Sequence, residues 1–239
     1  MEMSGQVYGR PKSACSTLRF PTVPGLRAAL AAMVILCAMP GTVAAAEIDV
    51  PAGSSLQAAI AAAAPGDTLR LAAGEYSGNV VIDKPLTLTG PQDRGASILG
   101  ERKGRTVWIQ AEDVTLRRLT IRHSGLSLVD MDAGIFLDKT ATRAHIVEND
   151  IIDNSVGVYL WGVKDALVEH NRIVGNTGLR VNERGNGLTV WNAPGSKIVD
   201  NDISEGRDGI YSNNSMQNVF ARNTFREVRY AVHYMYTND

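Results

Sequence analysis

Cysteine is scarce in this sequence. The 239-residue chain has two, Cys15 and Cys37, and both precede residue 47. Residues 47–239 therefore contain no thiol, which excludes a disulfide and a thiolate-bound metal from that part of the chain. Stability there must come from packing, and any metal must be bound by histidine, methionine, carboxylate or backbone groups.

A large net charge is also lacking. The chain has 24 Lys and Arg residues and 25 Asp and Glu residues. Residues 1–46 hold four of the basic residues and one acidic residue, so residues 47–239 have 20 basic and 24 acidic side chains, a charge of −4. This mildly acidic balance gives no electrostatic reason to expect nucleic acid as a partner. A Ser/His/Asp arrangement, a Walker loop and zinc-ligand spacing are missing as well.

Residues 1–46 have the features of an export signal. Four basic residues, Arg10, Lys12, Arg19 and Arg27, precede or open an apolar stretch at residues 26–39, and three alanines at residues 44–46 form a cleavage site before Glu47. We predict a signal peptide over residues 1–46 and a periplasmic mature chain without a membrane span. A membrane anchor is disfavoured because Pro40 and Gly41 interrupt the short apolar run. No Arg-Arg pair precedes that run, which favours the general export route.

An internal repeat dominates the remainder of the chain. Four asparagines recur at separations of 22, 30 and 22 residues, with an apolar residue three positions before and two positions after each of them: Asn149, Asn171, Asn201 and Asn223. A period near 22 residues with short alternating runs is typical of a solenoid, in which each unit must stack on its neighbours to bury its apolar side. We predict an all-β parallel β-helix over residues 47–239, with the asparagine row as a structural feature of the corners.

Residues 47–100 are predicted to form a start cap. Ser54 or Ser55 is placed to N-cap a short helix over residues 56–63, which Pro65 and Gly66 end. Short strands are expected at residues 68–71, 80–82 and 86–89. A helix at this point would cover the apolar end of the first coil.

A second strand in each coil carries an outward-facing row of aromatic residues. A Gly or Ala precedes each of these strands, at positions 134, 157, 187, 209 and 231, and strand periodicity then directs alternate side chains outward. The predicted partner or ligand face comprises Phe136, Tyr159, Trp161, Trp191 and Tyr211. Two coils carry longer loops, residues 123–132 and 177–186, which should project from one edge. The alternative is that these loops fold over the aromatic residues and bury them.

His233 and Met235 are the candidate metal ligands. They lie two positions apart on one face of the last predicted strand. Imidazole with thioether suits copper, cuprous copper in particular, better than zinc or magnesium. His145 and His170 are expected to be solvated. Asp130, Asp132 and Asp138 are close in sequence, but the outward rows hold no further carboxylate, so we predict no catalytic residues.

Four stretches resemble one family, the NosD proteins: residues 180–188, 190–195, 206–211 and 229–239. These are periplasmic maturation proteins for the copper sites of nitrous oxide reductase, built as right-handed parallel β-helices. The resemblance covers about residues 47–239. It implies a non-enzymatic role in copper insertion, with ABC transporter subunits and the reductase as partners and copper as a transient ligand.

Two further expectations accompany this resemblance. The chain stops at Asp239 before its next corner, whereas the family continues for further coils, so we expect a C-terminally truncated chain. The alternative function is a carbohydrate-binding or polysaccharide-modifying β-helix that uses the aromatic face.

Overall fold

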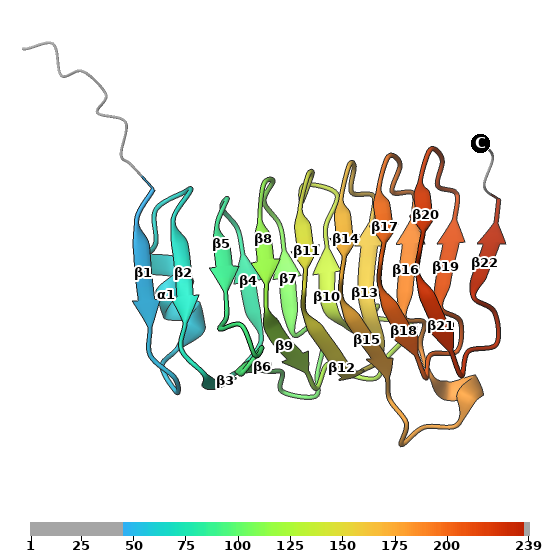
Figure 1. Ribbon diagram of the computed structural model, residues 1–239, viewed down its shortest axis with the longest axis horizontal. Helices are drawn as coiled ribbons and strands as arrows, with labels where there is room; N and C mark the ends of the chain where they lie inside the picture. Colours follow the sequence, from blue (N-terminus) through green and yellow to red (C-terminus); the bar gives the residue numbers. More distant parts are fainter. Residues whose placement is uncertain (1–44, 237–239) are drawn as a thin grey trace, which may run out of the picture. The chain divides into compact units, whose positions relative to one another are not determined.

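The computed structural model describes residues 45–236, which wind into successive coils of three short strands each (Figure 1). Corresponding strands of successive coils pair in parallel and form three sheets. The predicted signal peptide falls almost wholly on residues 1–44, outside the described part of the chain.

The strands are named in chain order. The first sheet consists of β1 (Glu47–Val50), β2 (Thr68–Leu71), β5 (Thr87–Thr89), β8 (Thr115–Arg117), β11 (His145–Val147), β14 (Leu167–Glu169), β17 (Lys197–Val199) and β20 (Val219–Ala221). The second sheet consists of β3 (Gly74–Ser77), β6 (Ala96–Leu99), β9 (Leu119–Arg122), β12 (Asp150–Asn154), β15 (Arg172–Gly175), β18 (Asp202–Ser204) and β21 (Thr224–Arg226). The third sheet consists of β4 (Val80–Ile82), β7 (Val107–Ile109), β10 (Ala133–Leu137), β13 (Val156–Trp161), β16 (Leu188–Trp191), β19 (Ile210–Asn213) and β22 (Val232–Met235). This arrangement is a parallel β-helix, as the repeat predicts.

The core is a set of aliphatic stacks that run along the coil axis. Ile151, Ile173 and Ile203 pair in register on neighbouring strands of the second sheet, and all three are fully buried. Ile146, Val168 and Ile198 do the same in the first sheet. Each such side chain contributes roughly 1.5–3 kcal/mol on burial. The fixed apolar offsets around each repeat asparagine are therefore the inward positions of two sheets.

The repeat asparagines form a hydrogen-bonded ladder at one corner. The Oδ1 atom of Asn171 accepts hydrogen bonds from both the backbone N and the Nδ2 of Asn149, at 2.9 and 3.0 Å. The Oδ1 atom of Asn201 accepts the same two hydrogen bonds from Asn171, and the Oδ1 atom of Asn223 accepts them from Asn201. The left-handed residue of this corner is the one before each asparagine, for example Glu148 and His170. The predicted structural role is confirmed: the asparagine side chains bond along the axis, and the left-handed conformation of the corner belongs to the preceding residue.

Glycine precedes the third-sheet strands because neighbouring coils approach closely there. A Cβ atom added at Gly157 would lie 2.5 Å from the carbonyl oxygen of Gly187, and one added at Gly187 would lie 2.8 Å from that of Gly209. Each of these glycines also faces a core isoleucine, Ile173 or Ile203, at 2.5 and 2.4 Å. A methyl group at Gly157 or Gly187 would therefore collide with the neighbouring coil.

The start of the chain combines a cap with complete coils. Helix α1 (Leu56–Ala62) begins after Ser55, whose Oγ accepts a hydrogen bond from the backbone N of Ala58 at 3.2 Å, and it buries Leu56 and Ile60. It lies at the β1–β2 end of the coil stack (Figure 1). Strands β3 and β6, which the sequence did not predict, place residues 74–99 in the coils and not in the cap.

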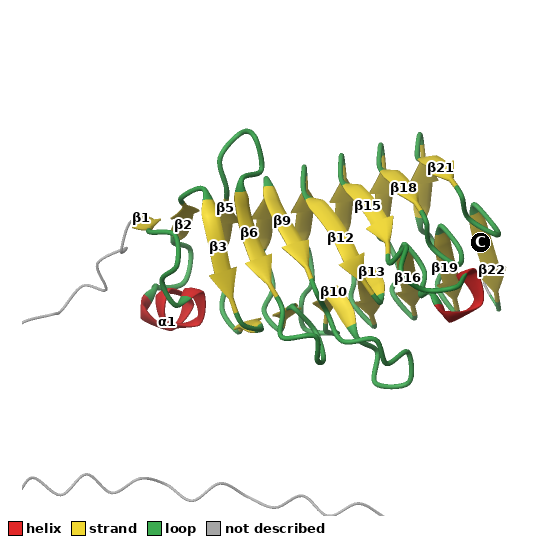
Figure 2. Cartoon of the chain, turned by 90° about the horizontal axis from the view of Figure 1, so that it is seen from below, coloured by secondary structure: helices red, strands yellow, loops and turns green. Residues whose placement is uncertain are grey.

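The two longer loops leave the same corner, between the second and third sheets. One joins β9 to β10 and the other joins β15 to β16, and in Figure 2 both lie on the lower edge of the coils. The second loop contains a single 3-10 turn, η1 (Val181–Glu183). Projection from one edge is therefore confirmed.

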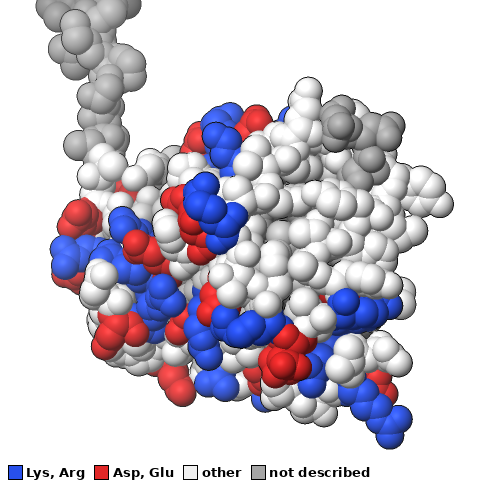
Figure 3. All heavy atoms as spheres, turned by 45° about the vertical axis from the view of Figure 1, so that its right-hand side comes forward, with Lys and Arg blue, Asp and Glu red and all other residues white. Residues whose placement is uncertain are grey.

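On the outer surface of the coils, basic and acidic side chains lie next to one another, as Figure 3 shows. Arg222 contacts Asp200 and Arg226 contacts Asp202, both at 2.6 Å and both across one coil step. Arg143 bridges Glu112 and Asp113, each at 2.7 Å. Several surface charges are thus paired along the axis.

Candidate functional site

The third sheet presents the predicted aromatic face, but its first member is covered. Phe136 is only 1% exposed and packs with Ala133 and Val156, beneath partly buried Trp108 and Met131. Met131 belongs to the loop between β9 and β10. Phe136 was predicted to lie on an exposed face, but it is buried, in part by this long loop, as the alternative prediction had it.

The remaining aromatic residues stay partly accessible. We use the term aromatic face for Tyr159, Trp161, Trp191 and Tyr211. Trp161 pairs in register with Trp191, which is 41% exposed, while Tyr159 and Tyr211 are half-buried. Burial, with a smaller contribution from Tyr211, raises the pKa of the Tyr159 hydroxyl. Thr189, which lies between the two tyrosines on the outward row, is buried.

Tyr211 brings the two candidate metal ligands together. Its ring contacts the ring of His233 edge to face, with centroids 5.3 Å apart, and its hydroxyl donates to the Sδ of Met235 at 3.3 Å. Tyr230 packs on the ring of His233 as well, at 5.2 Å. On β22, His233 is half-buried and Met235 is exposed. A thioether sulfur that accepts one hydrogen bond has a second lone pair that can bind a metal.

A buried carboxylate orients His233. The side chain of Asp208 is fully buried, and its Oδ2 lies 2.9 Å from the Nδ1 of His233. Because a carboxylate accepts hydrogen bonds, Nδ1 donates its proton to Asp208, and in the neutral form of the imidazole the free lone pair is on Nε2. Arg229 also binds Asp208, through two bonds of 2.9 and 2.8 Å. Burial acts to raise the pKa of Asp208, but the hydrogen bonds from Arg229 and His233 outweigh it, so the pKa lies below its usual value.

Sequence reasoning missed Asp208 and Arg229, although both lie in stretches that carry the NosD resemblance. The available clue was their proximity to the glycine row, since Asp208 directly precedes Gly209. Asp208 is 25 residues from His233, and only the coil repeat brings the two side chains into contact.

The other polar candidates do not converge on the aromatic face. His145 and His170 are exposed, as predicted. Asp132 accepts a hydrogen bond from the backbone N of Ser127, and Asp130 accepts one from its hydroxyl, so both carboxylates brace the first long loop. Within residues 45–236, no three His, Cys, Asp or Glu side chains group closely enough to hold a metal ion. No helix in that part of the chain is long and apolar enough to span a membrane.

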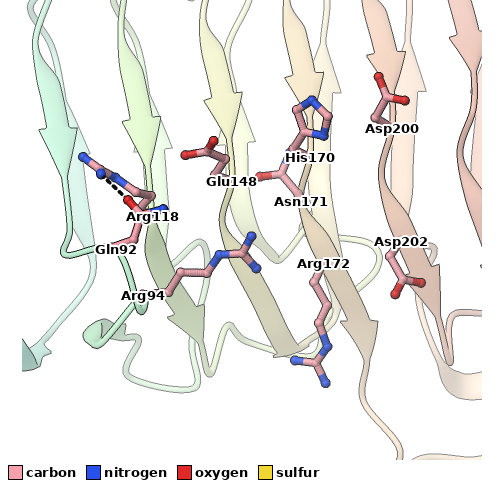
Figure 4. Close-up of a pocket in the computed structure, with 9 residues that line it drawn as sticks. All are labelled: Gln92, Arg94, Arg118, Glu148, His170, Asn171, Arg172, Asp200 and Asp202. Carbon is pink, nitrogen blue, oxygen red and sulfur yellow. Dashed lines mark hydrogen bonds between the residues drawn. The ribbon is translucent and has the colours of Figure 1, made fainter.

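A shallow charged groove of about 440 Å³ crosses the corner between the first and second sheets (Figure 4). Glu148, His170 and Asp200 follow one another along it on neighbouring coils. Arg117 binds Glu148 at 2.9 Å and Arg222 binds Asp200 at 2.6 Å. Since Glu148 and Asp200 are already paired with arginines of neighbouring coils, the groove follows the surface ion pairs.

The fold and the sequence together define the class of protein. The sequence model of the family described as "Right handed beta helix region" matches residues 105–238, so the chain belongs to that family. Two solved structures show the same fold. Alginate lyase from Paenibacillus sp. str. FPU-7 has a TM-score of 0.53 at 21% identity and covers 77% of this chain and 75% of its own. The Dettilon tailspike protein has a TM-score of 0.55 at 17% identity, over 73% and 41%.

Within this class the chain is similar to proteins named "Probable ABC transporter binding protein NosD". The relative from Stutzerimonas stutzeri is 36% identical over 140 residues, which is 59% of this chain and 32% of the relative. The relative from Pseudomonas aeruginosa is 37% identical over 139 residues, with 58% and 32% covered. The chain therefore spans about a third of the length of these curated relatives, and the resemblance predicted from the four sequence stretches is confirmed.

Proposed function

We propose that this chain is a periplasmic accessory protein that acts with an ABC transporter in inserting copper into nitrous oxide reductase. The similarity to the two NosD proteins carries this proposal, because their name assigns them to an ABC transporter. The role is non-enzymatic: the chain binds partners and passes on copper, and it needs no catalytic residues.

Copper, as cargo, would meet the Nε2 of His233 and the Sδ of Met235. Asp208 supports this assignment, since metal-binding histidines usually donate their other ring N–H to a carboxylate or carbonyl. A neutral imidazole beside a thioether is a soft donor set that favours cuprous ion. Two protein ligands leave coordination positions open, which suits an ion that is handed to a partner.

Titration of the exported protein with cuprous ion, in competition with a coloured chelator, tests the ligand assignment. We expect one ion per chain, and at least tenfold weaker binding for His233→Ala and for Met235→Ala. His170→Ala removes an exposed imidazole from the opposite side of the coils and should leave the affinity unchanged. No cuprous binding, or equal binding by all three variants, would contradict the assignment.

A cellular experiment tests the role itself. In a strain that lacks this protein, we expect nitrous oxide reductase to be produced with less copper and lower activity, and reintroduction of the gene should restore both. The tagged protein should co-purify with the ABC transporter subunits encoded in the same strain. Full copper occupancy of the reductase in the deletion strain would refute the proposal.

A further inference from the structure

A small cavity lies under the first long loop, away from His233. Its volume is about 300 Å³, and we call it the loop cavity. Its apolar walls come from Val80, Val81 and Trp108, and its remaining lining consists of Asn79, Gly104, Arg105, Asp130 and Asp132. Apolar walls with a few convergent polar groups are typical of small-molecule sites.

Arg105 is the unusual member of this lining. Its guanidinium carbon lies 3.8 Å from the ring centre of Phe136 and 4.6 Å from that of Trp108, so two aromatic rings hold it. Within residues 45–236 this half-buried cation makes no hydrogen bond and no ion pair, and both its Nε and the Nε1 of Trp108 are buried without a partner. Most buried polar groups in proteins are hydrogen-bonded, so unpaired ones need an explanation. The terminal guanidinium nitrogens of Arg105 are not among these buried atoms, and they are the donors that a ligand in the cavity would meet.

The loop that closes the cavity is held in a defined conformation. The backbone N of Gly125 donates to the carbonyl oxygen of Gly104 at 2.9 Å, which ties the loop beside Arg105. The Oδ2 of Asp132 accepts from the backbone N of Ser127 at 2.9 Å, and the Oδ2 of Asp130 accepts from the Ser127 hydroxyl at 2.7 Å. Each carboxylate keeps a second oxygen that can accept a hydrogen bond. The acceptors are thus fixed before a ligand arrives.

The charges of the lining restrict the chemical class of the ligand. An anion would pair with Arg105 but would meet the carboxylates of Asp130 and Asp132. A cation would pair with the carboxylates but would meet the guanidinium. Hydroxyl groups fit both, because one hydroxyl accepts from a guanidinium while it donates to a carboxylate. A carbon-rich ring can in turn pack on Trp108 and the two valines.

We propose that the loop cavity binds one uncharged sugar unit, with adjacent hydroxyls accepting from Arg105 and donating to Asp130 and Asp132. This inference does not depend on the copper-related function, since it involves neither His233 nor Met235. The site lies between β4, β7 with the segment that precedes it, and the first long loop.

Tryptophan fluorescence offers a local readout. The chain has three tryptophans, at positions 108, 161 and 191. The double variant Trp161→Phe, Trp191→Phe leaves Trp108 as the only tryptophan, which can be excited selectively over tyrosine. We expect a saturable change in its emission with at least one neutral trisaccharide of glucose, mannose or galactose. The trisaccharide of galacturonate, which adds negative charge, should bind at least tenfold more weakly.

Further variants in this background connect binding to the lining. Arg105→Gln and Asp130→Asn should each weaken binding at least tenfold, whereas Lys103→Ala, which removes a nearby cation outside the lining, should not. Asp130 is exposed, so its variant stays informative if Arg105→Gln fails to fold. The inference is overturned if no neutral trisaccharide binds, if galacturonate binds as tightly, or if Asp130→Asn binds as the parent does. Unchanged sugar binding by His233→Ala would separate this site from the copper assignment.

Discussion

At the scale of single residues, the asparagine ladder links neighbouring coils through side-chain hydrogen bonds, in addition to the backbone bonds of the sheets. Asn171 is almost fully buried, and its side chain takes part in four hydrogen bonds: two are accepted from Asn149, and the other two are donated to Ile146 and Asn201. A net contribution of about 1 kcal/mol per bond, and a penalty for partners left unpaired, make each rung important to stability.

Replacing Asn171 by Ala should therefore lower the free energy of unfolding by roughly 2–4 kcal/mol. The loss arises because Asn149 and the carbonyl of Ile146 would lose their partner while remaining buried. Urea unfolding followed by circular dichroism measures the change. The matched control is Asn182→Ala on the exposed second loop, for which we expect a shift below about 0.5 kcal/mol. Equal shifts for the two variants would contradict a stabilising role of the ladder.

At the scale of elements, the third sheet depends on the glycines near the start of its strands, such as Gly157, where neighbouring coils approach closely. Gly157→Ala would place a methyl group 2.5 Å from both the carbonyl oxygen of Gly187 and the Cγ2 of Ile173. We expect a loss of at least about 2 kcal/mol, comparable with overpacking of a core. In contrast, Gly178→Ala on the second long loop would meet a single flexible side chain, the Oδ1 of Asn176 at 3.1 Å. Thermal unfolding should separate the two variants by several degrees.

How much of this was predictable from the sequence differs between elements. The repeat period and strand alternation predicted the parallel coils, the second strands and the outward direction of Trp161 and Trp191, because all of these follow from backbone geometry. Strands β3 and β6 were missed because their coils lack the asparagine that marks later ones. Phe136 was predicted to lie outward, but its burial depends on the conformation of a loop, which no periodic pattern encodes.

The same limit applies to the candidate site. The sequence placed His233 and Met235 on one face of one strand, and the contacts of Tyr211 with both agree with that placement. The residues that orient or surround them come from other coils, such as Asp208, and their registration depends on the lengths of the intervening loops. Arg105 was missed for a similar reason, since a single arginine before a strand gives no indication that two rings will enclose it.

At the scale of the whole molecule, ion pairs between coils connect stability to pH. Arg143, Arg117 and Arg222 donate to Asp113, Glu148 and Asp200, and each of these bonds lowers the pKa of its carboxyl below the ordinary value. A carboxyl whose pKa is lower in the folded chain stabilises the fold above its unfolded pKa and loses that contribution as the pH falls through the folded pKa. The ordinary values are 3.8 for Asp and 4.5 for Glu, so the coils should lose stability below about pH 4.5.

His123 adds to this pH dependence from another side. Burial, assisted by Arg102, lowers its pKa from 6.5, so the folded chain protonates this imidazole less readily than the unfolded chain does. The unfolded chain then binds the proton more readily, and stability should begin to fall as the pH drops below about 6.5. Comparison of variants that all retain His123 cancels this contribution.

Asp208→Asn removes the charge of a fully buried carboxylate. At pH 7 we expect this variant to be destabilised by about 2–4 kcal/mol, because the bonds from Arg229 and His233 lose their charged acceptor. As the pH falls through the lowered pKa of Asp208, the parent carboxyl takes up a proton and loses the same advantage. Melting temperatures measured from pH 7 to pH 2.5 should therefore converge for the variant and the parent. Gly157→Ala changes no charge, so a plot of its melting temperature against pH should run parallel to that of the parent. A parallel plot for Asp208→Asn would mean that the contacts of Asp208 with Arg229 and His233 do not couple folding to protonation.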